Sequence, residues 1–160
     1  MSSYRMWGGP VVGQQVSHAW AGYGSAIFFE FGNLSPSDVV RRDGTLGNPS
    51  GEWTLSNMGA MPMWRLSLRG MVLADTDGLY RPQVSAIRLL IGRRLLSVEI
   101  EAVTRSTRLR FTHGFVLTTK APWQRVWKWP HWVLRRSDEW CEVALRGTTT
   151  TPIDWNCGAF

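Results

Sequence analysis

The residues that could perform acid–base chemistry are few and widely separated in this sequence. Glu30 is the carboxylate that most suggests a catalytic role, because it lies among phenylalanines in the run IFFEF at 27–31. Such a carboxylate either lies at an edge, pairs with an arginine, or has a perturbed pKa. The histidines His18, His113 and His131 form no catalytic or metal-ligand spacing. We expect Glu30 to pair with an arginine, and a small enzyme that uses Glu30 and a histidine is an alternative.

Pairs of acidic residues are the remaining candidates for binding a cation. Asp75 and Asp77 flank one residue in the stretch ADTDG. A calcium loop needs several more oxygen ligands at fixed steps, so this stretch is typical of a solvated turn. We therefore predict no metal site and no cofactor.

The stretch GYGSAIFFEFG at 22–32 resembles a phosphate-binding loop in its glycines alone. A dinucleotide-binding loop needs a strand, a glycine-rich turn and then a helix, so that phosphate meets the helix N-terminus. Here the glycines precede a strand-like run, and no helical pattern follows. Gly22 and Gly24 are therefore predicted to give backbone freedom at a turn.

The segment WQRVWKWPHW at 123–132 is the strongest candidate for binding a partner. Aromatic residues and arginine dominate the hot spots of protein interfaces, and aromatic rings also stack on single-stranded bases. Charged residues and Pro130 interrupt the segment, so at least one of its indoles is expected to be exposed, although the same indoles would also suit a core. The predicted partner-binding residues are Trp123, Arg125, Trp127, Lys128, Trp129 and Trp132.

The net charge of +6 raises the alternative of nucleic-acid binding. Only Lys120 and Lys128 are lysines, and an arginine excess of this kind also arises from GC-rich coding. The basic residues are scattered in pairs rather than in long runs. If nucleic acid is the partner, the predicted contacts are Arg105, Arg108 and Arg110.

The elements that must position these side chains are mostly strands. Alternation of apolar and polar residues predicts strands at 25–31, 52–56, 63–73, 93–103 and 107–120, with turns at 74–78 and at His113–Gly114. Apolar residues at helical spacing predict one short helix near 82–91, which Gly92 ends. Trp64 is expected to be a core residue. Antiparallel pairing would bring Glu99 and Glu101 close to Arg108 and Arg110.

These patterns predict a mainly β, α+β fold: an antiparallel sheet or a partly open barrel or sandwich, with one short helix. We expect a single domain over 1–160, a long polar surface loop at 33–51 and a C-terminal tail at 148–160.

The expected location is the cytoplasm. No stretch of about 18 apolar residues occurs, and the N-terminal run lacks the pattern of a signal peptide, so no membrane contact is expected. Cys141 and Cys157 are too few for a disulfide framework, although a single disulfide between them is an alternative.

The order of these features resembles that of small bacterial proteins found beside polymorphic toxins, some of them immunity proteins. The resemblance rests on GYGSAIFFEFG, WRLSLRG, the short helix before Gly92, LLSVEIEA, LRFTHGFVL and the late tryptophan strand, and covers residues 20–135. It implies a non-enzymatic protein that binds and neutralises a cognate toxin, with no catalytic residue carried over. Inhibitors of nucleases tend to be acidic, so the basic charge of this chain leaves the toxin's chemistry open. Homo-oligomerisation is also possible on the sequence alone.

Overall fold

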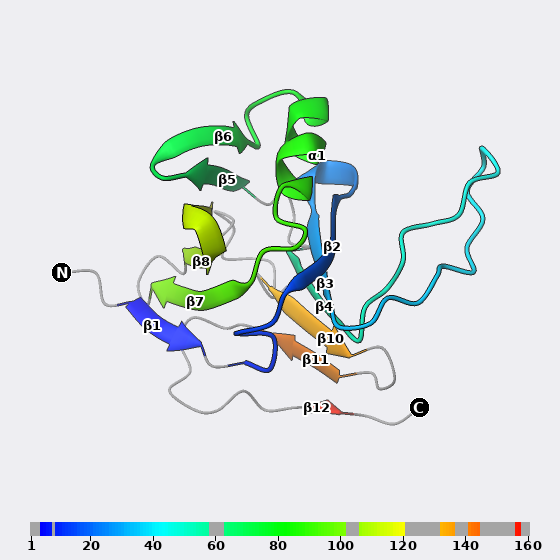
Figure 1. Ribbon diagram of the computed structural model, residues 1–160, viewed down its shortest axis with the longest axis horizontal. Helices are drawn as coiled ribbons and strands as arrows, with labels where there is room; N and C mark the ends of the chain where they lie inside the picture. Colours follow the sequence, from blue (N-terminus) through cyan, green and yellow to red (C-terminus); the bar gives the residue numbers. More distant parts are fainter. Residues whose placement is uncertain are drawn as a thin grey trace, which may run out of the picture.

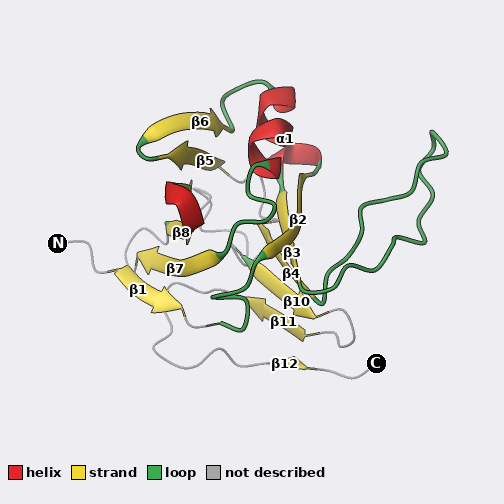
Figure 2. Ribbon diagram, viewed as in Figure 1, coloured by secondary structure: helices red, strands yellow, loops and turns green. Residues whose placement is uncertain are grey.

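The chain forms two antiparallel β-sheets and a short helix (Figures 1 and 2). The computed structural model describes residues 4–7, 9–57, 63–101, 106–120, 132–136, 141–144 and 156–157. The prediction of a mainly β fold with one short helix is confirmed for these residues, and the sheets do not close into a barrel. Within the same residues, no helix is long and apolar enough to cross a membrane.

The first sheet has the strand order β1-β7-β8-β9-β5-β6, and every neighbouring pair is antiparallel. Its strands are β1 (Tyr4–Trp7), β5 (Met63–Leu68), β6 (Met71–Asp75), β7 (Leu95–Glu101), β8 (Thr107–Phe111) and β9 (Phe115–Lys120). A short turn at Thr112–Gly114 joins β8 to β9, where the sequence predicts a turn.

The second sheet has the strand order β12-β11-β10-β4-β3-β2, again antiparallel throughout. Its strands are β2 (Val16–Ala21), β3 (Ile27–Phe31), β4 (Trp53–Asn57), β10 (Val133–Arg136), β11 (Cys141–Ala144) and β12 (Asn156–Cys157). The register places Cys141 of β11 opposite Cys157 of β12.

Helix α1 (Tyr80–Arg88) packs against β2 of one sheet and β6 of the other. It begins two residues before the predicted start at 82, and turns carry the chain from Leu89 to Gly92, where φ is 80°. The buried residues Ala86, Ile87 and Leu90 point its apolar side into the core.

The core lies between the inner faces of the two sheets. Phe29 of β3 meets Phe111 of β8 with ring centroids 5.6 Å apart, so an aromatic contact joins the sheets. Leucines from both sides complete the layer: Leu55, Leu66, Leu109, Leu117 and Leu134. Trp64 is buried, which confirms its prediction as a core residue.

Backbone hydrogen bonds also join the two sheets along one seam, where β2 begins and β7 begins. Gly13 donates to the Leu95 carbonyl at 2.7 Å, and Val16 donates to the Arg93 carbonyl at 2.8 Å. The sheets therefore share main-chain contacts as well as side-chain packing.

Three parts of the fold differ from the sequence-based expectation. The first is strand β1, which is not predicted from the sequence. The predicted strand at 63–73 is a hairpin, in which β5 and β6 are joined by a turn at Arg69–Gly70 with φ values of 49° and 86°. Gly70 is a turn residue, but arginine is unusual at positive φ, so the sequence lacks the Asn-Gly or Asp-Gly pair that marks a tight hairpin turn. Strand β2 is also missing from the prediction, because a register shift between Val16 and His18 breaks the alternation that marks a strand.

The polar segment 33–51 forms an arm between β3 and β4. Figure 1 shows it extending well away from both sheets. Most of its residues are exposed.

Candidate binding surfaces

The glycine-rich stretch that precedes β3 is a structural turn. The Gly22 amide donates to the Ala26 carbonyl at 2.7 Å and closes the β2–β3 connection. Ser25 takes the left-handed conformation, with φ of 63°, and its carbonyl accepts a hydrogen bond from the Trp64 indole at 2.9 Å. The stretch thus ties the hairpin of one sheet to a core tryptophan of the other.

Glu30 is buried, with 3% of its surface exposed, but its partners are not arginines. Its Oε2 atom accepts hydrogen bonds from the Gly51 amide at 2.9 Å and from the Thr54 hydroxyl at 2.6 Å. The expectation of an arginine partner is therefore wrong within the described residues. Neutral donors satisfy the carboxylate instead, and they hold the returning end of the arm against β3.

His18 lies opposite Glu30 in the β2–β3 register, so the structure does bring a histidine beside this carboxylate. The His18 Nε2 atom, however, faces the Asn48 side-chain oxygen at 3.4 Å. Asn48 belongs to the arm, so Glu30 and His18 both contact residues of the arm's returning half. The geometry thus gives both residues a role in fixing the arm.

The base of the arm is held at its outgoing end as well. The Ser17 hydroxyl donates to the Gly32 carbonyl at 2.6 Å, and the Asn33 amide donates to Glu52 Oε1 at 3.2 Å. Gly51 is required by close approach, because a Cβ atom there would lie 2.8 Å from the Phe31 nitrogen and closer still to its oxygen. These contacts fix where both ends of the arm leave the sheet.

The arm itself is an irregular hairpin. Ser35 and Ser50 exchange two backbone hydrogen bonds of 2.8 and 3.0 Å, and Val40 forms a bridge with Leu46. At the tip, the Thr45 hydroxyl and amide both donate to Asp43, and these two bonds hold the pKa of its carboxyl below the usual value. Hydrogen bonds within the arm therefore occur both near its base and at its tip.

Apolar side chains are exposed near the tip of this arm. Val39 and Val40 are each 63% exposed, and Leu46 is 55% exposed. Leu34, nearer the base, is also exposed. The arm thus carries several apolar side chains that no part of the described chain covers.

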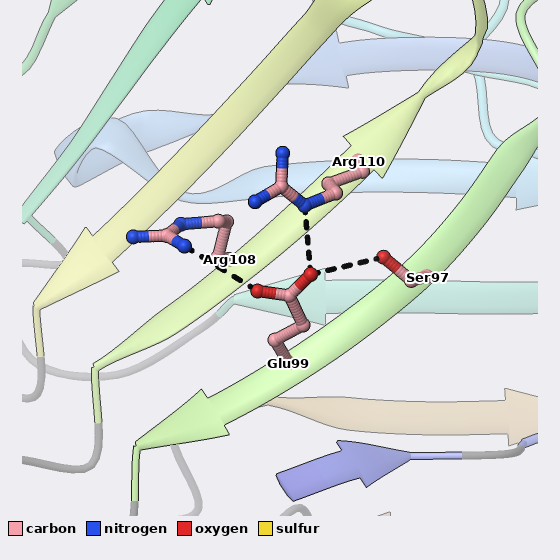
Figure 3. Close-up of polar contacts among 4 residues, drawn as sticks. All are labelled: Ser97, Glu99, Arg108 and Arg110. Atoms are coloured by element: carbon pink, nitrogen blue, oxygen red, sulfur yellow. Dashed lines mark hydrogen bonds and ion pairs between the residues drawn. The ribbon is translucent and has the colours of Figure 1, made fainter. Parts of the chain in front are cut away.

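The outer face of the first sheet carries the arginines predicted as nucleic-acid contacts. Glu99 of β7 accepts from Arg110 at 2.7 Å and faces Arg108 at 3.4 Å, both on β8 (Figure 3). The predicted cross-strand charge match is confirmed for Glu99. Because one carboxylate already serves both guanidinium groups, their charge toward a phosphate is reduced. Arg105 lies outside the described residues.

Asp75 and Asp77 behave as turn residues. The Asp77 amide donates to Asp75 Oδ1 at 3.1 Å, and Asp75 Oδ2 lies 3.7 Å from Arg65. In the part of the chain that the structure describes, histidine, cysteine and acidic side chains form no group that could hold a metal ion.

A second basic surface lies where three connections meet at one end of the first sheet. We call Arg69, Arg93, Arg94 and His113 the cationic turn cluster. Its members are linked by contacts between the connections: the Arg69 amide donates to the Gly114 carbonyl at 3.0 Å, and Arg93 Nη1 lies 3.3 Å from His113 Nδ1. The Arg94 amide donates to the Thr112 hydroxyl at 3.1 Å.

The arginines of this cluster have only neutral partners among the described residues. Arg94 Nη1 donates to the Gly13 carbonyl, and Arg93 lies over the Phe115 ring with its Cζ 5.4 Å from the centroid. By contrast, Arg65, Arg108 and Arg110 all pair with carboxylates. The sequence shows the Arg93–Arg94 pair but not the cluster, because residues 69, 94 and 113 come together only through strand pairing.

Most of the predicted tryptophan surface, Trp123, Arg125, Trp127, Lys128 and Trp129, lies outside the described residues, and its role stays a prediction. Trp132 is described, and its assignment to a partner-binding surface is corrected here. It is fully buried, stacks near Phe29 with centroids 6.3 Å apart, and donates its indole N–H to the Thr107 hydroxyl at 2.8 Å. A core position satisfies both its apolar ring and its single donor.

Comparison of the chain with protein-family models, curated proteins and solved structures gives no match.

Proposed function

We propose that this chain is a non-enzymatic protein-binding module and that the arm at 33–51 is its main contact surface. The observation that carries the proposal is an arm whose base is held by a buried hydrogen bond from Gly51 to Glu30 and by the Ser17–Gly32 bond, and whose outer part exposes apolar side chains. Long connections inside compact domains are uncommon and often functional.

The fixed base lowers the free-energy cost of binding a partner through the exposed residues. Ordering a mobile loop costs binding free energy, and an arm that is already held by its own contacts avoids much of that cost. Val39, Val40 and Leu46 remain accessible to a partner, and burying one such side chain gains on the order of 1.5–3 kcal/mol. A few well-buried side chains of this kind can dominate an interface.

The partner class in this proposal is a cognate bacterial toxin, which the chain binds and neutralises as an immunity protein does. The resemblance in the order of strands supports this choice. A toxin with an apolar groove or pocket would accept the arm.

The test is complex formation with the protein encoded by the adjacent gene, measured by calorimetry with the purified chain. The arm variant is Val39→Ser with Val40→Ser, and the control is Met71→Ser with Val72→Ser, because those apolar residues are also exposed, by 64% and 49%, but lie on the β5–β6 hairpin. We expect the arm variant to weaken binding by about tenfold or more, or about 1.4 kcal/mol, and the control to change it by less than about twofold. No complex at micromolar concentration, or equal effects of both variants, would contradict the proposal.

A further inference from the structure

We infer that the cationic turn cluster is a second binding site, and that it takes carboxylate groups of a protein partner. The inference rests on the proposed function in treating the partner as a protein. It uses a different surface from the arm, so the two can fail separately.

Within the part of the chain that the structure describes, the cluster is a concentration of positive charge without a counter-charge. Arg94 contacts a carbonyl oxygen, and Arg93 contacts an imidazole nitrogen and an aromatic ring. No described carboxylate pairs with either of them or with Arg69. These neutral contacts hold Arg93 and Arg94 in place and leave their positive charge available. Guanidinium groups held in this way suit carboxylates, which they bind through two parallel hydrogen bonds.

One donor within the cluster lacks an acceptor. The Arg93 Nε atom is buried and has no hydrogen-bond partner among the described residues. Leaving a buried donor unpaired is costly, and such groups are rare in folded proteins. Because Nε is buried, an arriving carboxylate would meet the outer nitrogens of this guanidinium, and its negative charge would still stabilise the buried part of the cation.

Two members of the cluster also have the left-handed backbone conformation. Arg69 has φ of 49° and His113 has φ of 67°, and each is followed by a glycine at positive φ. Glycine, asparagine, aspartate and histidine are the residues most often found at positive φ, whereas arginine is uncommon there, so the strain falls on Arg69. Strained residues of this kind are found more often at functional sites, where the residue is kept for what its side chain does although its backbone conformation is unfavourable.

The surroundings of the cluster favour a protein partner over a nucleic acid. Exposed apolar side chains lie in the same stretch of chain: Leu89 and Ile91 precede Arg93, and Leu96 follows Arg94. Mixed apolar and arginine surfaces are typical of protein interfaces. Single-stranded nucleic acids need exposed rings for stacking, whereas Phe115 is buried beneath Arg93.

The experiment measures fluorescence anisotropy of three labelled probes with the full chain at low salt. The first is a short peptide of Glu-Glu-Leu repeats, the second is the same peptide with glutamine in place of glutamate, and the third is an oligothymidylate of similar length. We expect the glutamate peptide to bind about tenfold more tightly than the glutamine peptide and more tightly than the oligothymidylate.

Variants locate the site. Arg69→Asn and Arg94→Gln should each weaken binding of the glutamate peptide about three- to tenfold, and the control Arg65→Gln, which removes a charge already paired with Asp75, should change it less than about twofold. The arm variant Val39→Ser with Val40→Ser should bind this peptide normally, so failure of the arm proposal stays distinguishable. Circular dichroism confirms that each variant is folded.

The inference is overturned if the oligothymidylate binds more tightly than the glutamate peptide, which would indicate a nucleic-acid site. It is equally overturned if the two peptides bind alike, or if Arg65→Gln weakens binding as much as the two cluster variants do.

Discussion

Replacing Glu30 tests whether this buried carboxylate holds the arm or performs chemistry. Both of its hydrogen bonds end on the same atom, Oε2, which accepts from Gly51 and Thr54. A glutamine can place its carbonyl oxygen at that position and keep both donors. An alanine keeps neither, and Gly51, which is itself buried, then has an unpaired amide.

The expected magnitudes differ accordingly. An unpaired buried amide costs about 1–3 kcal/mol, and the bond from the partly buried Thr54 hydroxyl adds about 1 kcal/mol. Glu30→Ala should therefore lower the free energy of unfolding by about 2–4 kcal/mol. In Glu30→Gln each bond loses its charge assistance, about 1 kcal/mol apiece, but a buried charge is also removed. We expect a net loss of about 1 kcal/mol or less.

Two measurements check these values. Urea unfolding gives the difference in the free energy of unfolding. Native-state hydrogen exchange reports on the Gly51 amide, which should lose its protection in Glu30→Ala. The amides of β9 serve as the reference, because their exchange should change only as much as the free energy of global unfolding does. Thr54→Val, which removes the hydroxyl donor alone, serves as the intermediate control. If Glu30→Gln costs as much as Glu30→Ala, or if Gly51 keeps its protection in the alanine variant, the hydrogen-bonding role assigned to Glu30 is wrong.

Three further predictions concern stability alone. Gly51→Ala should lower the melting temperature strongly, by the equivalent of about 2 kcal/mol or more, because its Cβ would meet backbone atoms of Phe31; an unchanged melting temperature would contradict the close approach. Arg69→Asn should raise the free energy of unfolding by about 0.5–1 kcal/mol, because asparagine tolerates the positive φ better, and urea unfolding that shows a loss would remove the strain argument. Trp132→Phe should cost about 1–3 kcal/mol, since it keeps the stacking near Phe29 but leaves Thr107 without the indole donor, and a variant as stable as the parent would show that this bond contributes nothing.

The parts of the fold that follow local patterns were predictable from sequence. Strand β8 alternates Leu109 and Phe111 with two arginines, and this alternation alone identifies both the strand and its buried face. The helix near 82–91 is marked by apolar spacing and by Gly92. Where a register shift or an unusual turn residue interrupts the pattern, as at Val16–His18 and at Arg69, the prediction fails.

The candidate surfaces were less predictable because they depend on contacts between distant residues. Glu30 is 21 residues from Gly51, and its partner there is a backbone amide, a group that every residue but proline carries and that no sequence pattern distinguishes. The cationic turn cluster likewise draws on three separate connections. For Trp132 a sequence pattern exists but has two meanings, because an indole near charged residues in the sequence suits an interface and a core equally well.

The way the arm is anchored bears on how such a protein could change its specificity. Phe31 and Trp53, which flank it, are partners in the β3–β4 ladder, so the sheet fixes the distance between the two ends whatever lies between them. The entropic cost of closing a loop rises slowly with the length of the loop, and doubling that length adds only about 0.6 kcal/mol. Insertions, deletions or wholesale replacement within 34–47 would therefore leave the sheets intact. The arm can diversify rapidly while the scaffold stays constant, as antibody loops do on their framework.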